Sequence, residues 1–197
     1  MATIRIHDEK NTLIEHQEEV ARFLDEQEVI YEQWNIEKLP SELSEKYDLT
    51  EDEKERILAA FDTEIQDISA RRGYQSQDVI SLSDTTPNLD ELLKNFQREH
   101  HHTDDEVRFI VSGHGIFVIQ GKDGTFFDVR LNPGDLISVP ENIRHYFTLQ
   151  EDRRVVAIRI FVTTEAGCRF TKMKVCKTDR RPNLSCTHRH ERFFIVI

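Results

Sequence analysis

Short apolar segments at regular intervals in the second half of the chain constrain its fold more than any other feature. Each segment spans only a few residues and is rich in β-branched and aromatic side chains, which are typical of strands. The segments are residues 106–111, 115–119, 126–130, 136–139, 145–149 and 155–161. Turn-forming sequences such as Ser112-Gly113 and Asn132-Pro133-Gly134 separate them. This pattern predicts an antiparallel β-barrel or sandwich.

The first half of the chain carries helical periodicity, apart from an alternating strand-like pattern in residues 1–6. Helices are expected at residues 12–27, 51–72 and 88–96. Thr50 and Glu53 have the spacing of a capping box, which opens the second helix, and Gly73 is expected to end it. The predicted fold class is therefore mainly β with helices, in which a helical N-terminal region precedes the barrel.

Composition narrows the class of protein. The chain has 197 residues, of which 38% are hydrophobic and 32% charged, and this describes a water-soluble chain of one domain. A net charge of −11 repels phosphate backbones, so we expect no nucleic-acid partner. No apolar run reaches the roughly 18 residues of a membrane span, and the opening residues lack the apolar core of a secretory signal. We expect a cytoplasmic monomer that does not bind membranes.

The segment from Glu99 to Arg108 carries the candidate metal ligands. Alternate residues of an extended chain share a face, so His100 and His102 point one way and His101 the other. Glu106 lies an even number of residues further on and can return to the same face. Imidazoles with a carboxylate suit iron, nickel, manganese or zinc.

A second segment can complete this site. Pro133-Gly134-Asp135 marks a turn, an apolar strand follows, Pro140 ends that strand, and His145 begins the next one. A barrel could bring His145 beside the first three ligands. Consecutive histidines alone would favour a solvated run or an adventitious metal binder, but the spaced Glu106 and the second segment favour a built site.

Together the two segments resemble the paired motifs of the cupin superfamily. The first motif is His-x-His, three residues, Glu, six residues and Gly, and the chain matches it at His100, His102, Glu106 and Gly113. The second motif is Gly, five residues, Pro, four residues and His, and the chain matches it at Gly134, Pro140 and His145. Two departures are visible, since Asn142 stands where many cupins have Gly and Leu149 where many have Asn.

Within that superfamily the chain resembles the bacterial acireductone dioxygenase family of methionine salvage. The matching strings include Glu-His-x-His-x-Asp-x-Glu-x-Arg from Glu99 to Arg108, with Arg144-His145-x-Phe147 and Ala157-Ile-Arg159-Ile-Phe. The resemblance covers about residues 3 to 165. It implies a cupin-type double-stranded β-helix, with residues 1–165 as one domain and the barrel at roughly 74–165.

The resemblance also implies a cofactor and a reaction. One Fe²⁺ or Ni²⁺ per chain would bind His100, His102, Glu106 and His145. An enediol, 1,2-dihydroxy-3-keto-5-methylthiopentene, would react with O₂ as the second substrate. Iron would give the 2-keto acid and formate, whereas nickel would give methylthiopropionate, carbon monoxide and formate.

Four further residues are assigned to the substrate. Arg108 lies two residues after Glu106 and so on the same strand face, where a guanidinium can pair with anionic oxygens. The resemblance implies the same catalytic role for Arg159, and substrate-binding roles for Phe96 and Phe147. Without the resemblance, Arg159 would be read as a surface ion pair and the two phenylalanines as ordinary core residues.

The resemblance stops after Glu165. There the family continues Gly-Trp-Val-Pro-Ile-Tyr, whereas this chain continues Ala-Gly-Cys-Arg-Phe-Thr. One choice of codons for residues 166–176, read one base earlier, spells the family's sequence. We interpret residues 166–197 as an atypical tail that arose from a frame shift, with a genuine variant end as the alternative.

Two other functions remain open at the level of sequence. The chain could be another metal-dependent cupin enzyme, such as an oxidase or an isomerase, or a cupin that binds a metal or small ligand without catalysis. Arg108, Arg159 and the aromatic pair favour the dioxygenase, because a metal store needs none of them. The sequence does not distinguish iron from nickel.

Overall fold

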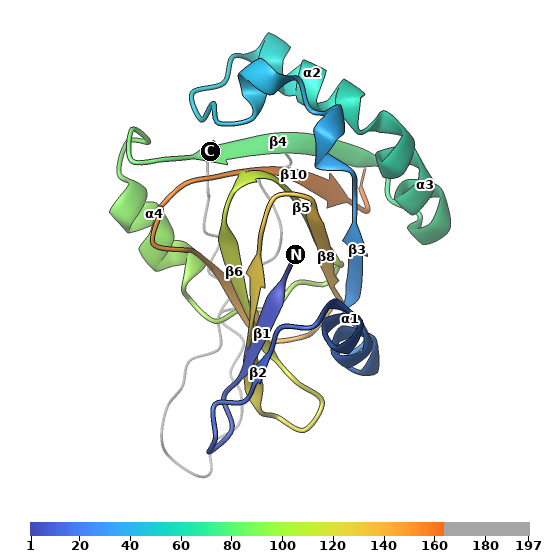
Figure 1. Cartoon of the computed structure of the whole chain (residues 1–197), viewed down its shortest axis with the longest axis vertical. Coiled ribbons are helices and arrows are strands. Elements are labelled where there is room, and N and C mark those ends of the chain that lie inside the picture. The colour runs from blue at the N-terminus through green and yellow to red at the C-terminus, as the bar shows by residue number, and fades with distance from the viewer. Residues whose placement is uncertain (164–197) are drawn as a thin grey trace.

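Two antiparallel sheets of five strands form the body of the fold in residues 1–163, which are the residues described by the computed structural model (Figure 1). The first sheet has the order β2-β1-β7-β6-β9, with β2 (Leu13–Ile14), β1 (Thr3–Ile6), β7 (Phe126–Leu131), β6 (Gly115–Gln120) and β9 (His145–Leu149). The second has the order β3-β8-β5-β10-β4, with β3 (Ile30–Gln33), β8 (Asp135–Val139), β5 (Glu106–Gly113), β10 (Val155–Phe161) and β4 (Ser76–Leu82). The predicted fold class, mainly β with helices, is confirmed.

The main core lies between the inner faces of the two sheets. On β7, Phe127, Val129 and Leu131 are buried, whereas the residues between them are partly exposed, as strand alternation requires. Ile137 of β8 and Ala157 of β10 belong to the same buried cluster. Side chains from both sheets therefore meet in one interior. The segments that carry the candidate metal ligands border this interior.

A second core separates the second sheet from two helices, α2 (Glu51–Ala60) and α3 (Asp62–Arg72), which Figure 1 shows along that side of the molecule. Phe61 and Phe109 pack edge to face with ring centroids 4.7 Å apart, and Trp34 lies 4.6 Å from Phe109. Such aromatic contacts add to the stabilisation that burial of apolar area provides. The outer face of the second sheet is thus covered, so nearly every residue of its central strands β5 and β8 is buried.

The helical predictions were partly correct. The Thr50–Glu53 capping box forms and Gly73 ends α3 with a φ of +79°. The single helix expected at 51–72 is wrong, because the chain breaks at Phe61, where φ is −113° and ψ is 14°. That break lets the Phe61 ring turn into the second core.

The other helices also differ from the prediction at their first residues. The helix expected at 12–27 is α1 (Gln17–Glu26), since Leu13–Ile14 pairs with β1 as a short strand. The third is α4 (Leu89–Phe96). Strands β1, β2 and β3 precede residue 74, where the predicted barrel began, and join the same two sheets. No helix within residues 1–163 is both long and apolar enough to cross a membrane. The predicted tail, residues 166–197, lies outside the described residues.

Candidate metal centre

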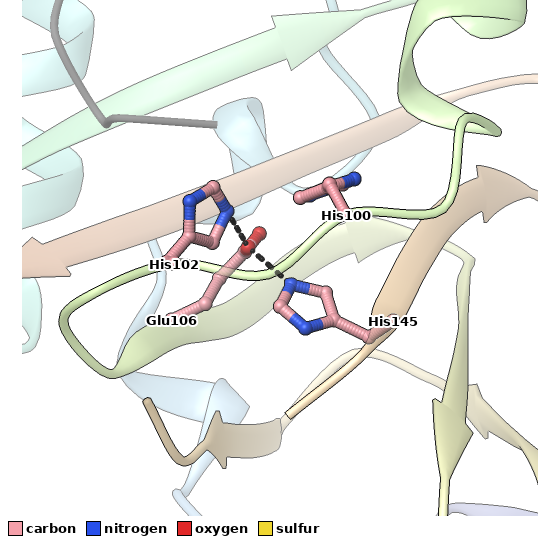
Figure 2. Close-up of side chains that lie close together, drawn as sticks. All are labelled: His100, His102, Glu106 and His145. Carbon is pink, nitrogen blue, oxygen red and sulfur yellow. Dashed lines mark hydrogen bonds and ion pairs between the residues drawn. The ribbon is translucent and has the colours of Figure 1, made fainter. Parts of the chain in front are cut away.

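Four buried side chains converge at one place inside the barrel, and they are the four predicted from sequence (Figure 2). One potential ligand atom from each of His100, His102, Glu106 and His145 lies within 4.8 Å of the others. Exposed fractions of these residues range from 1% for His145 to 9% for His102 and Glu106. A buried cluster of three imidazoles and a carboxylate is unusual unless its members are paired or bind a cation.

Backbone hydrogen bonds bring the two halves of the cluster together. The amide of His100 donates to the carbonyl of His145 over 3.0 Å, and the amide of His145 donates back over 2.9 Å. The amide of Asn142 donates to the carbonyl of His102 over 2.8 Å. His145 is also held in the first sheet, opposite Ile119 of β6. The segment before β5 therefore lies directly against the start of β9.

The departure at Asn142 has a conformational reason. Asn142 has a φ of +63°, in the left-handed region that glycine adopts freely and asparagine tolerates better than most residues. Gly113 keeps the residue that the motif requires, because its φ is +68° and a Cβ there would lie 2.2 Å from the carbonyl oxygen of Arg154. The motif positions thus encode the turns that deliver the ligands.

Hydrogen bonds on the far side of two rings fix which nitrogen faces the cluster. The Nδ1 of His100 lies 2.6 Å from the carbonyl oxygen of Arg98, and the Nδ1 of His145 lies 2.8 Å from that of Ile143. Because a carbonyl only accepts, both Nδ1 atoms carry the hydrogen, and each Nε2 of a neutral ring keeps its lone pair. This arrangement is typical of histidines that bind metals.

One of these lone pairs, that of His145, meets an acceptor rather than a donor. Nε2 of His102 lies 2.7 Å from Oε2 of Glu106, and Nε2 of His145 lies 2.9 Å from the same oxygen. A neutral ring that uses Nδ1 as its donor cannot also donate through Nε2, so the contact between His145 and Glu106 requires an added proton or a cation. Nδ1 of His102 is buried without a hydrogen-bond partner in residues 1–163. The donor set therefore fits a divalent transition metal.

The electrostatic surroundings keep two of the ligands in the forms that bind metals. Burial lowers the pKa of His100 to about 4, so this ring is neutral at neutral pH. Burial alone would raise the pKa of Glu106, but the positive charge of Arg108 and the contacts with His102 and His145 hold it well below its usual range. A neutral imidazole at His100 and an ionised carboxylate at Glu106 are the states that metal coordination requires.

The structure places the two predicted arginines on neighbouring strands. An Nη atom of Arg108 lies 2.9 Å from Oε1 of Glu106, on the carboxylate oxygen opposite the one that meets the histidines. Burial lowers the pKa of Arg108 from its very high ordinary value. Arg159 of β10 stands directly opposite Arg108 of β5 and makes a forked ion pair with Asp78 of β4.

The two predicted phenylalanines occupy different places around the core. Phe147 lies two residues after His145 on β9, and its ring centroid is 5.1 Å from that of Phe117. Phe117 in turn lies 6.2 Å from the His145 ring. Phe96 ends α4 and packs at the edge of the main core. Sequence reasoning missed Phe117 and Asp78, although the β-branched and apolar residues Val79, Ile80 and Leu82 could have revealed β4.

Comparison with known proteins agrees with this geometry. Residues 3–169 match the model of the ARD/ARD′ family. The chain is 99% identical over 165 residues to the acireductone dioxygenase of Bacillus velezensis and 83% identical over 165 residues to that of Bacillus subtilis. Each alignment covers 84% of this chain and 93% of the relative.

A solved structure is similar as well. It is the acireductone dioxygenase from Bacillus anthracis with a cadmium ion in its active centre, 73% identical in sequence. The superposition has a TM-score of 0.81 and covers 84% of this chain and 95% of that one. With the family model matched over most of the chain and these identities, the chain belongs to the ARD/ARD′ family.

Proposed function

We propose that this chain is a metal-dependent acireductone dioxygenase that binds one Fe²⁺ or Ni²⁺ through His100, His102, Glu106 and His145. As a member of the family it takes a small-molecule acireductone and O₂ as substrates. The substrate that we propose is 1,2-dihydroxy-3-keto-5-methylthiopentene, an intermediate of methionine salvage. The observation that carries the proposal is the convergence of three imidazoles and one carboxylate inside the barrel. It is supported by the 83% sequence identity to the acireductone dioxygenase of Bacillus subtilis.

The proposed ligands divide their roles by charge. A bound divalent metal would supply Lewis acidity, which lowers the pKa of an enediol. Four protein ligands would leave coordination positions for the enediol. Carbonyl acceptors on the Nδ1 side hold His100 and His145 with Nε2 toward the centre. Glu106 contributes the one negative charge and is itself oriented by Arg108. These outer contacts make the ligand geometry rigid before the metal arrives.

Arg108 and Arg159 are proposed to receive the anionic oxygens of the substrate. Both lie on strands of the second sheet, opposite one another, with side chains 20% and 23% exposed. A guanidinium offers two parallel donors to a pair of oxygens, and it stays charged at all relevant pH values. Phe147 and Phe96 would contribute apolar walls to the substrate site, and their partial burial leaves surface for this contact.

Metal identity is proposed to control the products. Iron and nickel share a preference for nitrogen and oxygen ligands, so the same four residues can hold either ion. With iron we expect the 2-keto acid and formate, and with nickel methylthiopropionate, carbon monoxide and formate. Neither the ligand set nor Arg108 distinguishes two divalent ions by charge.

The test compares two reloaded forms of one protein. Metal is stripped with a chelator, the apo-protein is divided and reloaded with iron or nickel, and each form is given the acireductone with O₂. We expect carbon monoxide only from the nickel form and the keto acid only from the iron form. Identical products would refute metal control. No oxygen consumption by either form would favour a cupin that binds metal without catalysis.

We also propose that residues 1–165 form one domain and that residues 166–197 are a frame-shifted tail. A third proposal is that the protein is a cytoplasmic monomer without nucleic-acid or membrane partners. The net charge of −11 supports the absence of nucleic acid. Truncation after Glu165 is expected to leave metal stoichiometry unchanged. Resequencing of the gene would test the frame shift, and light scattering would test the oligomeric state.

A further inference from the structure

Three charged residues form a row across the second sheet. Arg159 of β10 is the register partner of Arg108 on β5 and of Asp78 on β4. Residues two positions away on the same faces, Ile110 and Ile80, pack in the core between the sheets. The row therefore faces the barrel interior, on the side where Glu106 and the other proposed ligands lie.

Two neighbouring guanidinium groups would repel one another if nothing compensated them, since like charges directly opposite in a sheet are destabilising. Each has its own carboxylate. Arg108 pairs with Glu106 over 2.9 Å. Arg159 pairs with Asp78 through two contacts, of 2.6 Å from Nε and 2.5 Å from an Nη atom. Each positive charge of the row therefore has one negative partner: Glu106 on the same strand for Arg108, and Asp78 on the next strand for Arg159.

The pair between Asp78 and Arg159 restricts the guanidinium more than a single contact would. A forked contact through Nε and Nη fixes both the plane and the direction of the group. The Phe161 ring lies 5.4 Å from the guanidinium carbon and limits it further. Both partners are only about a quarter exposed, at 23% for Arg159 and 25% for Asp78, so water screens the pair weakly.

We propose that Asp78 is a positioning residue for the dioxygenase reaction: it holds Arg159 beside Arg108, so that the two guanidinium groups together receive the anionic enediol. This inference rests on the proposed function and adds a residue to it. Asp78 touches neither the ligand cluster nor, as we infer, the substrate. It acts through Arg159, which without it would turn away from the like charge of Arg108.

Asp78→Asn is the direct test, because the amide keeps the size of the side chain but removes its charge and presents an N–H group to the guanidinium. We expect kcat/KM for the acireductone to fall roughly tenfold to a hundredfold, as when a binding group is misplaced by about 1 Å. Metal content should stay at the wild-type value, and Tm should fall because the two guanidinium groups then repel one another. Asp78→Glu, which keeps the charge on a longer arm, should recover part of the loss.

A matched control comes from Asp152. Its side chain is 23% exposed and lies 2.8 Å from Nδ1 of His114 and 3.7 Å from Nε of Arg154, and none of the proposed site residues is among its partners in the described chain. Asp152→Asn should therefore leave kcat/KM unchanged. This variant separates loss of one partly buried ion pair from loss of the particular pair that holds Arg159.

Two results would overturn the inference. If Asp78→Asn lowers Tm but leaves kcat/KM at the wild-type value, Asp78 only braces β4 against β10. If Asp78→Glu is as impaired as Asp78→Asn while both keep their metal, the charge of residue 78 is not what positions Arg159. Wild-type protein measured in parallel tests the proposed function itself, since a wild-type protein without turnover refutes that function rather than the role of Asp78.

Discussion

Acidification of the metal-free protein should reveal the burial of His100. The ring is 4% exposed, and burial lowers its pKa to about 4 from an ordinary value of 6.5. As the pH falls, the unfolded chain therefore binds a proton at this residue before the folded chain does. The free energy of unfolding must decrease through that interval, because protonation stabilises the unfolded state first.

The size of the effect follows from the two pKa values. The difference between 6.5 and about 4 corresponds to about 3 kcal/mol, of which about 2 kcal/mol is lost between pH 7 and pH 4.5. Glu106 acts in a different range. Its pKa lies well below 4.5, so its contribution to stability is intact at pH 4.5 and is lost only as the pH falls further.

Urea denaturation of the apo-protein at several pH values between 7 and 4.5 measures this loss. The variant His100→Gln removes the titrating ring, and its free energy of unfolding should depend less steeply on pH than that of the wild type. His101→Gln, which changes the neighbouring histidine outside the cluster, should retain the wild-type slope. Parallel curves for wild type and His100→Gln would refute the assignment of this pH dependence to a buried neutral imidazole.

Three further predictions concern the proposed site. His100→Ala should lose bound metal, measured by elemental analysis, while His101→Ala should keep it, and the opposite result would contradict the strand-face argument. Arg108→Ala should keep stoichiometric metal yet lose turnover, and Arg108→Lys should recover little because the forked geometry is gone; normal turnover of Arg108→Ala would exclude a role on the substrate. Gly115→Ala would place a Cβ 2.6 Å from the Phe147 ring. The free energy of unfolding should therefore fall by about 1–3 kcal/mol in a denaturation assay, and KM should rise without a change in metal content. An unchanged KM would argue against Phe147 as a substrate contact.

Local sequence pattern was sufficient for most strands of the second half. The expected segment 145–149 coincides with β9, and the expected segment 155–161 coincides with β10. These segments are rich in β-branched and aromatic residues and follow turn residues, so neighbours in sequence carry the signal. The strands missed before residue 100 are β2, β3 and β4. All three are edge strands, and the pairing of β3 with β8 and of β4 with β10 depends on partners distant in sequence.

The interruption at Phe61 shows the limit of helical periodicity. Ile57 and Ile65 continue one apolar stripe through the break, so the pattern on either side predicts a single helix. What breaks it is the pocket that Trp34 and Phe109 offer to the Phe61 ring. Trp34 directly follows β3 and Phe109 lies on β5. Both are far in sequence from Phe61, so the residues around Phe61 do not reveal the break.

The chemistry of the proposed site could be predicted from a short stretch of sequence. Alternation along an extended segment predicts His100 and His102 on one face and His101 on the other, and the structure returns Glu106 to the first two after a bend at residues 103–104. The types of these residues then determine the class of metal that they suit.

Tertiary structure alone decided how the parts meet. The hydrogen bonds between His100 and His145 complete the ligand cluster, and the register of β10 puts Arg159 between Arg108 and Asp78. Register between strands far apart in sequence depends on the packing of both sheets around a shared core, and a shift of one residue would turn every side chain to the other face. Periodicity specifies the face of each residue, whereas only the assembled sheets specify its neighbour.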